Sequence, residues 1–159
     1  RIVGCEGHLA LAGEGPLLED IKTLADNLGI RNRVHFLGFR QDIPILIQAS
    51  VATILVSHQE GLPRCIMESF SIGVPVIGTA IRGVRDLLAD DCGLLVNVGD
   101  VNALTNAITW ILDNPQQARE MGNRGRIRMA DYDLDHIIDL HEKLYAKALC
   151  QEEELLNPL

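Results

Sequence analysis

The chain has 159 residues, which suits one domain, and its 47% hydrophobic content is enough to form a packed core. It contains no stretch approaching the roughly 18 apolar residues of a membrane-spanning helix. The formal charge of -8, with no long cluster of Lys and Arg, argues against nucleic acid as a partner, because the two polyanions would repel each other.

Strands and helices alternate in the first third of the chain. Residues 8–12 predict a short strand, and a GEGP turn leads into a helix over 17–28, where leucine and isoleucine recur at helical spacing. Gly29 follows as a residue that can close this helix. A second strand is predicted over 33–39 and a short helix over 42–50.

The same alternation continues through the rest of the chain. Residues 51–57 are apolar on both faces, which predicts a fully buried strand. Asp100 can cap a later helix. The remaining expected elements are a helix over 63–72, strands over 75–78 and 92–97, a brief helix over 83–90, helices over 101–114, 115–130 and 134–150, and a flexible tail over 151–159.

This alternation predicts an α/β fold: a Rossmann-like parallel sheet with helices on both faces. In such sheets ligands bind beyond the carboxyl ends of the strands. Candidate functional residues should therefore lie in the turns after Ala12, Leu37 and Val56.

The most informative of these turns is "SHQEGLPRCIMESF", residues 57–70. Gly61 permits close approach of a ligand to the backbone, and Pro63 starts a helix whose free first-turn amides can bind an anion. Glu60 precedes these amides and Glu68 follows them within the helix. Carboxylates repel phosphate but accept hydrogen bonds from hydroxyls, so the pattern fits a nucleotide-sugar, with phosphates between two hydroxylated ends.

A purely structural interpretation of the two glutamates stays open at this point. Glu60 could cap the helix, and Glu68 could belong to a solvated helix face. The apolar neighbours of Glu68, which are Ile66, Met67 and Phe70, make simple solvation less favourable.

Five sequence blocks, in order, resemble retaining glycosyltransferases of family four, which have the GT-B architecture. "LALAGEGPL" is similar to the family's G-x-G-P turn, "RVHFLGF" to its V-x-F-x-G strand, and "EGLPRCIMESFSIGVPVIGT" to its E-x7-E region. "GLLVNVGDVNALTNAI" and "DYDLDHIIDLHEKLY" resemble two later blocks. The resemblance covers nearly the whole chain and implies the C-terminal, donor-binding half of a two-domain enzyme.

The resemblance implies a role for each matching residue. Glu60 would be the catalytic residue, in the sense that it contacts and orients the donor sugar rather than attacking it. Glu68 would bind the ribose hydroxyls. The other donor-binding residues would be Gly61, Leu62 and Pro63 beside the sugar, Arg64 and Cys65 at the diphosphate, and Gly38, Phe39 and Arg40 at the base. Gly13 and Gly15 would contact the ligand or simply form a tight turn.

The resemblance further implies that two structural parts typical of family members are absent from residues 1–150. These are a strand–helix unit with an Arg and a Lys for the diphosphate, and an N-terminal acceptor domain through which any membrane contact would occur. "RIVG" at residues 1–4 could be a remnant of the absent central strand.

The implied reaction is transfer of a hexose from a nucleoside diphosphate-sugar to an acceptor hydroxyl with retention, in glycan or polysaccharide biosynthesis. Family frequency favours UDP, and neither a metal nor another cofactor is implied. One alternative is an isolated nucleotide-sugar-binding module without transfer activity. Two others are a related epimerase, which would need a general acid/base pair, and a hydrolase using Ser57 and His58, which lacks a nucleophile elbow.

The four cysteines, at 5, 65, 92 and 150, form neither a C-x-x-C pair nor a zinc-binding spacing. We interpret them as reduced thiols. Together with the lack of a recognisable leader segment, they predict a cytoplasmic protein.

Overall fold

The computed structural model describes residues 7–156, with side chains described as far as residue 149. Its strands are β1 (Leu9–Ala12), β2 (Val34–Gly38), β3 (Thr53–Leu55), β4 (Val76–Thr79) and β5 (Gly93–Val96). Its helices are α1 (Leu18–Asn27), α2 (Ile43–Gln48), α3 (Arg64–Ile72), α4 (Val84–Leu87), α5 (Val101–Asp113), α6 (Pro115–Arg128) and α7 (Leu134–Leu156). Short 3-10 turns at Arg31–Arg33 and Met129–Tyr132 precede β2 and α7.

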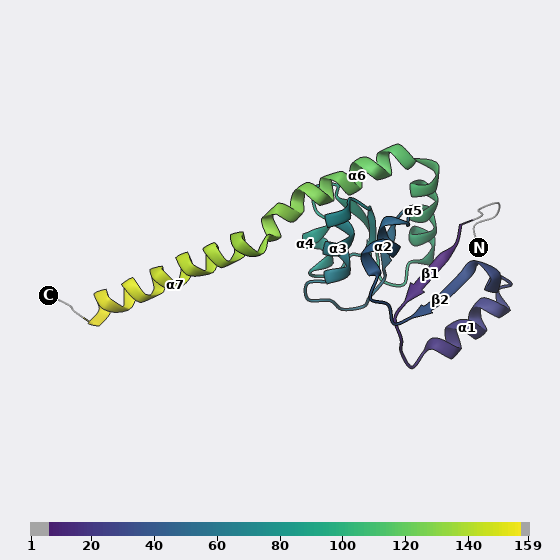
Figure 1. The fold of residues 1–159 in the computed structure, drawn as a ribbon, viewed down its shortest axis with the longest axis horizontal. Coiled ribbons are helices and arrows are strands. Elements are labelled where there is room, and N and C mark those ends of the chain that lie inside the picture. Colours follow the sequence, from purple (N-terminus) through teal and green to yellow (C-terminus); the bar gives the residue numbers. More distant parts are fainter. Residues whose placement is uncertain (1–6, 157–159) are drawn as a thin grey trace.

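All strand pairs are parallel, which confirms the predicted α/β fold with helices packed on a parallel sheet. The strands are divided between two sheets, however, where the sequence predicted one. β1 pairs with β2 (Figure 1). In the other sheet β4 lies between β3 and β5. Within the described residues, β1, β2, β3 and β5 each have one edge without a partner strand.

Helices cover both faces of the three-stranded sheet. Val76 and Ile77 are adjacent in β4 and are almost fully buried, yet they belong to different hydrophobic clusters, because successive residues of a strand point to opposite faces. Val76 packs with residues of α3 and α4, including Ile66 and Phe70. Ile77 packs with residues of α5 and α6, including Ile111.

The prediction of a fully buried strand over 51–57 is wrong. The strand comprises only Thr53–Leu55, and all of its residues are partly exposed. The flanking Val51 and Val56 are 67% and 49% exposed. The physical reason is that β3 is an edge strand, so only β4 covers it within its sheet.

The apolar stripe of α1 is also largely uncovered. The helix forms where helical periodicity predicted it, and Gly29 ends it at a φ of 64°. Ala25 is buried, but Leu17, Leu24 and Leu28 are each more than half exposed. The hydrophobic clusters that surround the three-stranded sheet include no residue of α1 or of β1–β2.

α7 extends away from the rest of the molecule as a single long helix (Figure 1). It continues to Leu156, and 157–159 lie outside the described residues, so the expected flexible tail over 151–159 stays a prediction. The hypothesis of a strand remnant at 1–4 also falls outside them. None of the described helices combines the length and apolar character needed to cross a membrane.

Asp100 caps α5 as predicted, since its Oδ1 accepts a hydrogen bond of 2.9 Å from the backbone N–H of Ala103. We expect Asp100→Ala to lower the free energy of unfolding by about 1 kcal/mol, because a first-turn amide loses its acceptor. Urea denaturation followed by circular dichroism measures this change. Asp113→Ala, at the other end of the same helix, is the control, and an equal loss in both variants would contradict the assignment.

Candidate functional site

The loop after β3 carries Glu60, and a residue of the same loop holds its side chain through a hydrogen bond. The hydroxyl of Ser57 donates a hydrogen bond of 2.6 Å to Glu60 Oε1. Both side chains are half-buried, whereas His58 is exposed. Ser57 is thus paired with a carboxylate and not with His58, which argues against the serine hydrolase alternative.

The amino end of α3 lies directly after this loop. Pro63 is buried and forms the N-cap in an extended conformation, and no side chain caps the helix, so Glu60 does not serve as its cap. The first amides with a backbone acceptor are those of Ile66 and Met67, which both donate to the carbonyl of Pro63. The N–H groups of Arg64 and Cys65 donate to no carbonyl in the described chain, and orphan amides of this kind are available to an anion.

Cys65 lies between the two glutamates. Burial raises the pKa of its thiol, and the negative charges of Glu60 and Glu68 raise it further. Both carboxylates are therefore close enough to the first turn of α3 to act on the same group. The thiol is protonated at neutral pH, so Cys65 offers its backbone amide to a ligand and not a thiolate.

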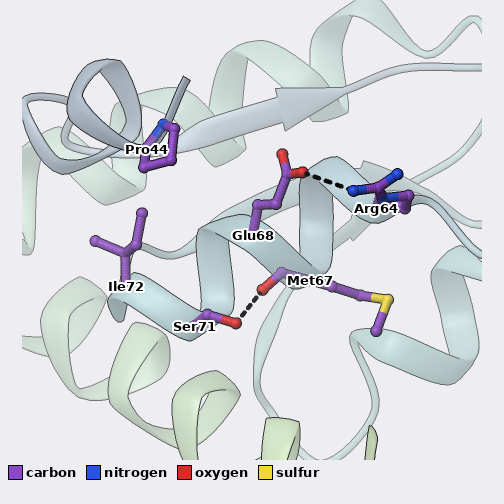
Figure 2. A pocket seen from close by; sticks show the side chains of 6 residues that line it. All are labelled: Pro44, Arg64, Met67, Glu68, Ser71 and Ile72. Carbon is purple, nitrogen blue, oxygen red and sulfur yellow. Dashed lines mark hydrogen bonds and ion pairs between the residues drawn. The ribbon is translucent and has the colours of Figure 1, made fainter. Parts of the chain in front are cut away.

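Glu68 projects from α3 into a shallow pocket of about 320 Å³ between α2 and α3 (Figure 2). Pro44 forms the opposite wall, and Met67, Ser71 and Ile72 complete the lining with Arg64. The closest approach between the charged groups of Arg64 and Glu68 is 3.9 Å, with 89% and 40% of their side chains exposed. An exposed pair at this distance contributes little to stability, so a ligand can displace it at small cost.

The turns after β1 and β2 are joined to each other. The N–H of Gly13 donates to the carbonyl of Gly38 over 2.8 Å, and both residues have positive φ. Gly15 lies in the open, exposed turn after Gly13. Phe39 is 72% exposed and is therefore free to stack on a planar ligand. Arg40 forms a bidentate pair with Asp42, at 2.8 and 2.6 Å.

The structure thus brings the predicted residues into two groups at the carboxyl ends of the two sheets. One comprises the turns after β1 and β2, and the other comprises residues 57–68. Pro44 connects them, because it lies four residues after Arg40 and lines the pocket that contains Glu68. Pro44 itself was not predicted, and a proline in a helix start gives no functional signal in sequence.

Sequence reasoning also missed Thr79, the last residue of β4, and Gly83 after that strand, which contact the loop that carries Glu60. In sequence these are an isolated threonine and an isolated glycine, and their contacts join segments more than 20 residues apart.

Among the described side chains, no three His, Cys, Asp or Glu residues gather as a metal site would require. Cys65 and Cys92 are free thiols, Cys5 lies outside the described residues, and the side chain of Cys150 is not described.

Comparison with protein families gives a match to the family described as "Glycosyl transferases group 1" over residues 6–128. The N-acetyl-alpha-D-glucosaminyl L-malate synthase of Bacillus anthracis is 30% identical over 146 residues, covering 91% of this chain and 38% of the relative. The UDP-Gal:alpha-D-GlcNAc-diphosphoundecaprenol alpha-1,3-galactosyltransferase of Escherichia coli is 32% identical over 106 residues, covering 65% and 27%. The chain thus spans well under half the length of these relatives.

Solved structures give the same picture. Anabaena Alr3699/HepE in complex with UDP superposes with a TM-score of 0.79 at 27% identity, covering 88% of this chain and 41% of that one. The same protein in complex with UDP-glucose gives a TM-score of 0.80 at 26% identity, covering 87% and 41%.

Proposed function

The chain belongs to the group 1 glycosyl transferases, and on this premise we propose that it binds the donor of a retaining hexosyltransferase in glycan or polysaccharide biosynthesis. The observation that carries the proposal is the amino end of α3, where two unpaired amides lie between two carboxylates at the carboxyl edge of a parallel sheet. This arrangement matches a diphosphate with a hydroxylated group on each side.

In the proposed complex, the amides of Arg64 and Cys65 bind the diphosphate. Glu68 accepts hydrogen bonds from the ribose hydroxyls, and its pocket beside Pro44 receives the ribose. Glu60 accepts hydrogen bonds from the hexose hydroxyls, assisted by backbone groups of the exposed residues Gly61 and Leu62. Pro63 has no N–H, so its contribution is to start the helix.

The turn after β2 provides the proposed contact with the base. Phe39 stacks on the ring, while Gly38 and Arg40 offer backbone groups, since the guanidinium of Arg40 is paired with Asp42. Gly13 and Gly15 support this turn from the end of β1. UDP is the nucleotide we propose, supported by the UDP and UDP-glucose complexes of Alr3699/HepE and by the UDP-Gal donor named for the Escherichia coli relative.

The proposed reaction breaks the bond between the anomeric carbon and the diphosphate and forms one from that carbon to the acceptor oxygen, on the same face of the sugar. The acceptor proton leaves with the diphosphate. Amides at the start of α3 stabilise the negative charge that develops on the leaving group, and we assign no step to a metal or another cofactor. The α products named for both curated relatives support retention from α-linked donors.

Transfer in this proposal requires more than the described residues. Both sheets have unpaired edges and the apolar stripe of α1 is exposed, which supports a further strand–helix unit beside the described sheets. We propose that this unit carries cations for the diphosphate. An acceptor domain completes the enzyme and makes any contact with a membrane. The 159-residue chain by itself then binds donor without transferring sugar.

The free thiols of Cys65 and Cys92 support a cytoplasmic location.

Calorimetric titration of this chain with UDP and with GDP tests the proposal. We expect UDP to bind and Glu68→Ala to weaken its affinity by about 10- to 100-fold, because a charge-assisted hydrogen bond to the ribose is lost. Glu142→Ala, an exposed glutamate on α7, is the matched control. Binding that survives Glu68→Ala unchanged would contradict the assigned role, and tighter binding of GDP would overturn the choice of base.

A further inference from the structure

We propose that Ser57, Thr79 and Gly83 are positioning residues that together hold the carboxylate of Glu60 in place for the donor sugar. This inference rests on the proposed function of Glu60. It concerns the loop 57–61. The end of β4 and the segment after β4 contact this loop and hold it in place.

The first support is the hydrogen bond from the Ser57 hydroxyl to Glu60 Oε1, at 2.6 Å. It occupies one of the two carboxylate oxygens and fixes the rotation of the group. The second oxygen makes no hydrogen bond in the described structure, so it is available to a sugar hydroxyl. Ser57 thereby sets the direction in which the carboxylate of Glu60 faces.

The second support anchors Ser57 itself. Thr79, at the end of β4, is 1% exposed and donates a hydrogen bond of 2.6 Å from Oγ1 to the backbone carbonyl of Ser57. Burying a hydroxyl costs free energy unless it is hydrogen-bonded, and this bond satisfies the hydroxyl of Thr79. It also fixes the point where the loop leaves β3.

The third support is a contact between two backbones. Gly83 has a φ of 80°, and a Cβ at this position would lie 1.9 Å from the carbonyl oxygen of Gly61 and 3.4 Å from that of Glu60. Only glycine allows this approach. The segment after β4 is therefore packed directly against the peptide that follows the Glu60 side chain.

Ser57→Ala tests the inference in the full-length protein with a UDP-sugar donor. We expect kcat to fall by about 10- to 100-fold, the equivalent of one charge-assisted hydrogen bond, while affinity for UDP is unchanged. Ser57→Thr keeps a hydroxyl and should restore kcat. Ser50→Ala is the matched control, because its hydroxyl makes an equally short bond of 2.6 Å to the carbonyl of Leu46 and not to the loop that carries Glu60. Unchanged kcat, or equal losses of kcat and UDP affinity, would overturn the role of Ser57.

Hydrogen exchange of the peptide 57–62 provides a readout that does not depend on the reaction. Exchange should accelerate in both Ser57→Ala and Gly83→Ala, and not in Ser50→Ala. Wild-type exchange rates in both variants would overturn the inference. A wild-type protein that neither binds UDP nor transfers sugar would instead refute the proposed function, while the exchange result would still decide whether these residues hold the loop.

Discussion

Glu60→Gln is expected to lower the kcat of sugar transfer by about 100-fold in the full-length protein, with little change in its affinity for UDP. The substitution keeps the shape of the side chain but removes the charge that orients the sugar hydroxyls, and a misplaced sugar reacts far more slowly. UDP contains ribose but lacks the transferred hexose, so we expect its binding not to involve this carboxylate. Steady-state kinetics with a UDP-sugar and calorimetry with UDP together measure the two effects.

The comparison with Glu68 makes this expectation specific. Glu68→Ala should weaken UDP binding itself, because we place that carboxylate at the ribose. Glu142→Gln controls for the loss of one negative charge elsewhere on the surface. If the Glu60 and Glu68 variants lost UDP affinity equally, the division between a sugar end and a ribose end would be wrong.

Phe70→Ala should have the largest effect on stability, lowering the free energy of unfolding by about 3–5 kcal/mol. Phe70 is 0% exposed and packs with Ile66 and Val76 at the centre of one hydrophobic cluster. A Cβ at Gly125 of α6 would lie 2.4 Å from the Phe70 ring, so that helix packs directly against the ring. Typical domains are stable by only about 5–15 kcal/mol, and a large fraction of the folded protein would therefore be lost on mild heating.

Urea denaturation of the same chain measures this loss. Phe39→Ala is the matched control, because Phe39 is 72% exposed and its removal leaves no cavity. A Phe70→Ala variant that is no less stable than Phe39→Ala would show that α6 does not close this cluster.

The parts of the fold that depend on local sequence could be predicted well. The cap at Asp100, the glycine that ends α1 and the start of α3 after Pro63 follow from residues within one helical turn. The division into two sheets could not be predicted, because it depends on which strands become neighbours. The same reason explains why the apolar run at 51–57, which predicts a buried strand, contains an edge strand instead.

The candidate site shows the same limit. The pairing of Glu60 and Glu68 around a helix start is visible in sequence, because both lie in one short segment. The contacts of Thr79 and Gly83 with that segment arise from the packing of β4 beside β3. Such contacts have no sequence signature of their own, since threonine and glycine are common at the ends of strands.

The separation of β1, α1 and β2 from both hydrophobic clusters has a consequence for binding energetics. These elements contact mainly one another, so they can open as a local cooperative unit at a lower free energy than the three-stranded sheet. The proposed donor touches both units, through the turn after β2 and the first turn of α3. Ordering the first unit against the second opposes part of the intrinsic binding free energy, and we expect the affinity of this chain for the donor to be lower by that amount.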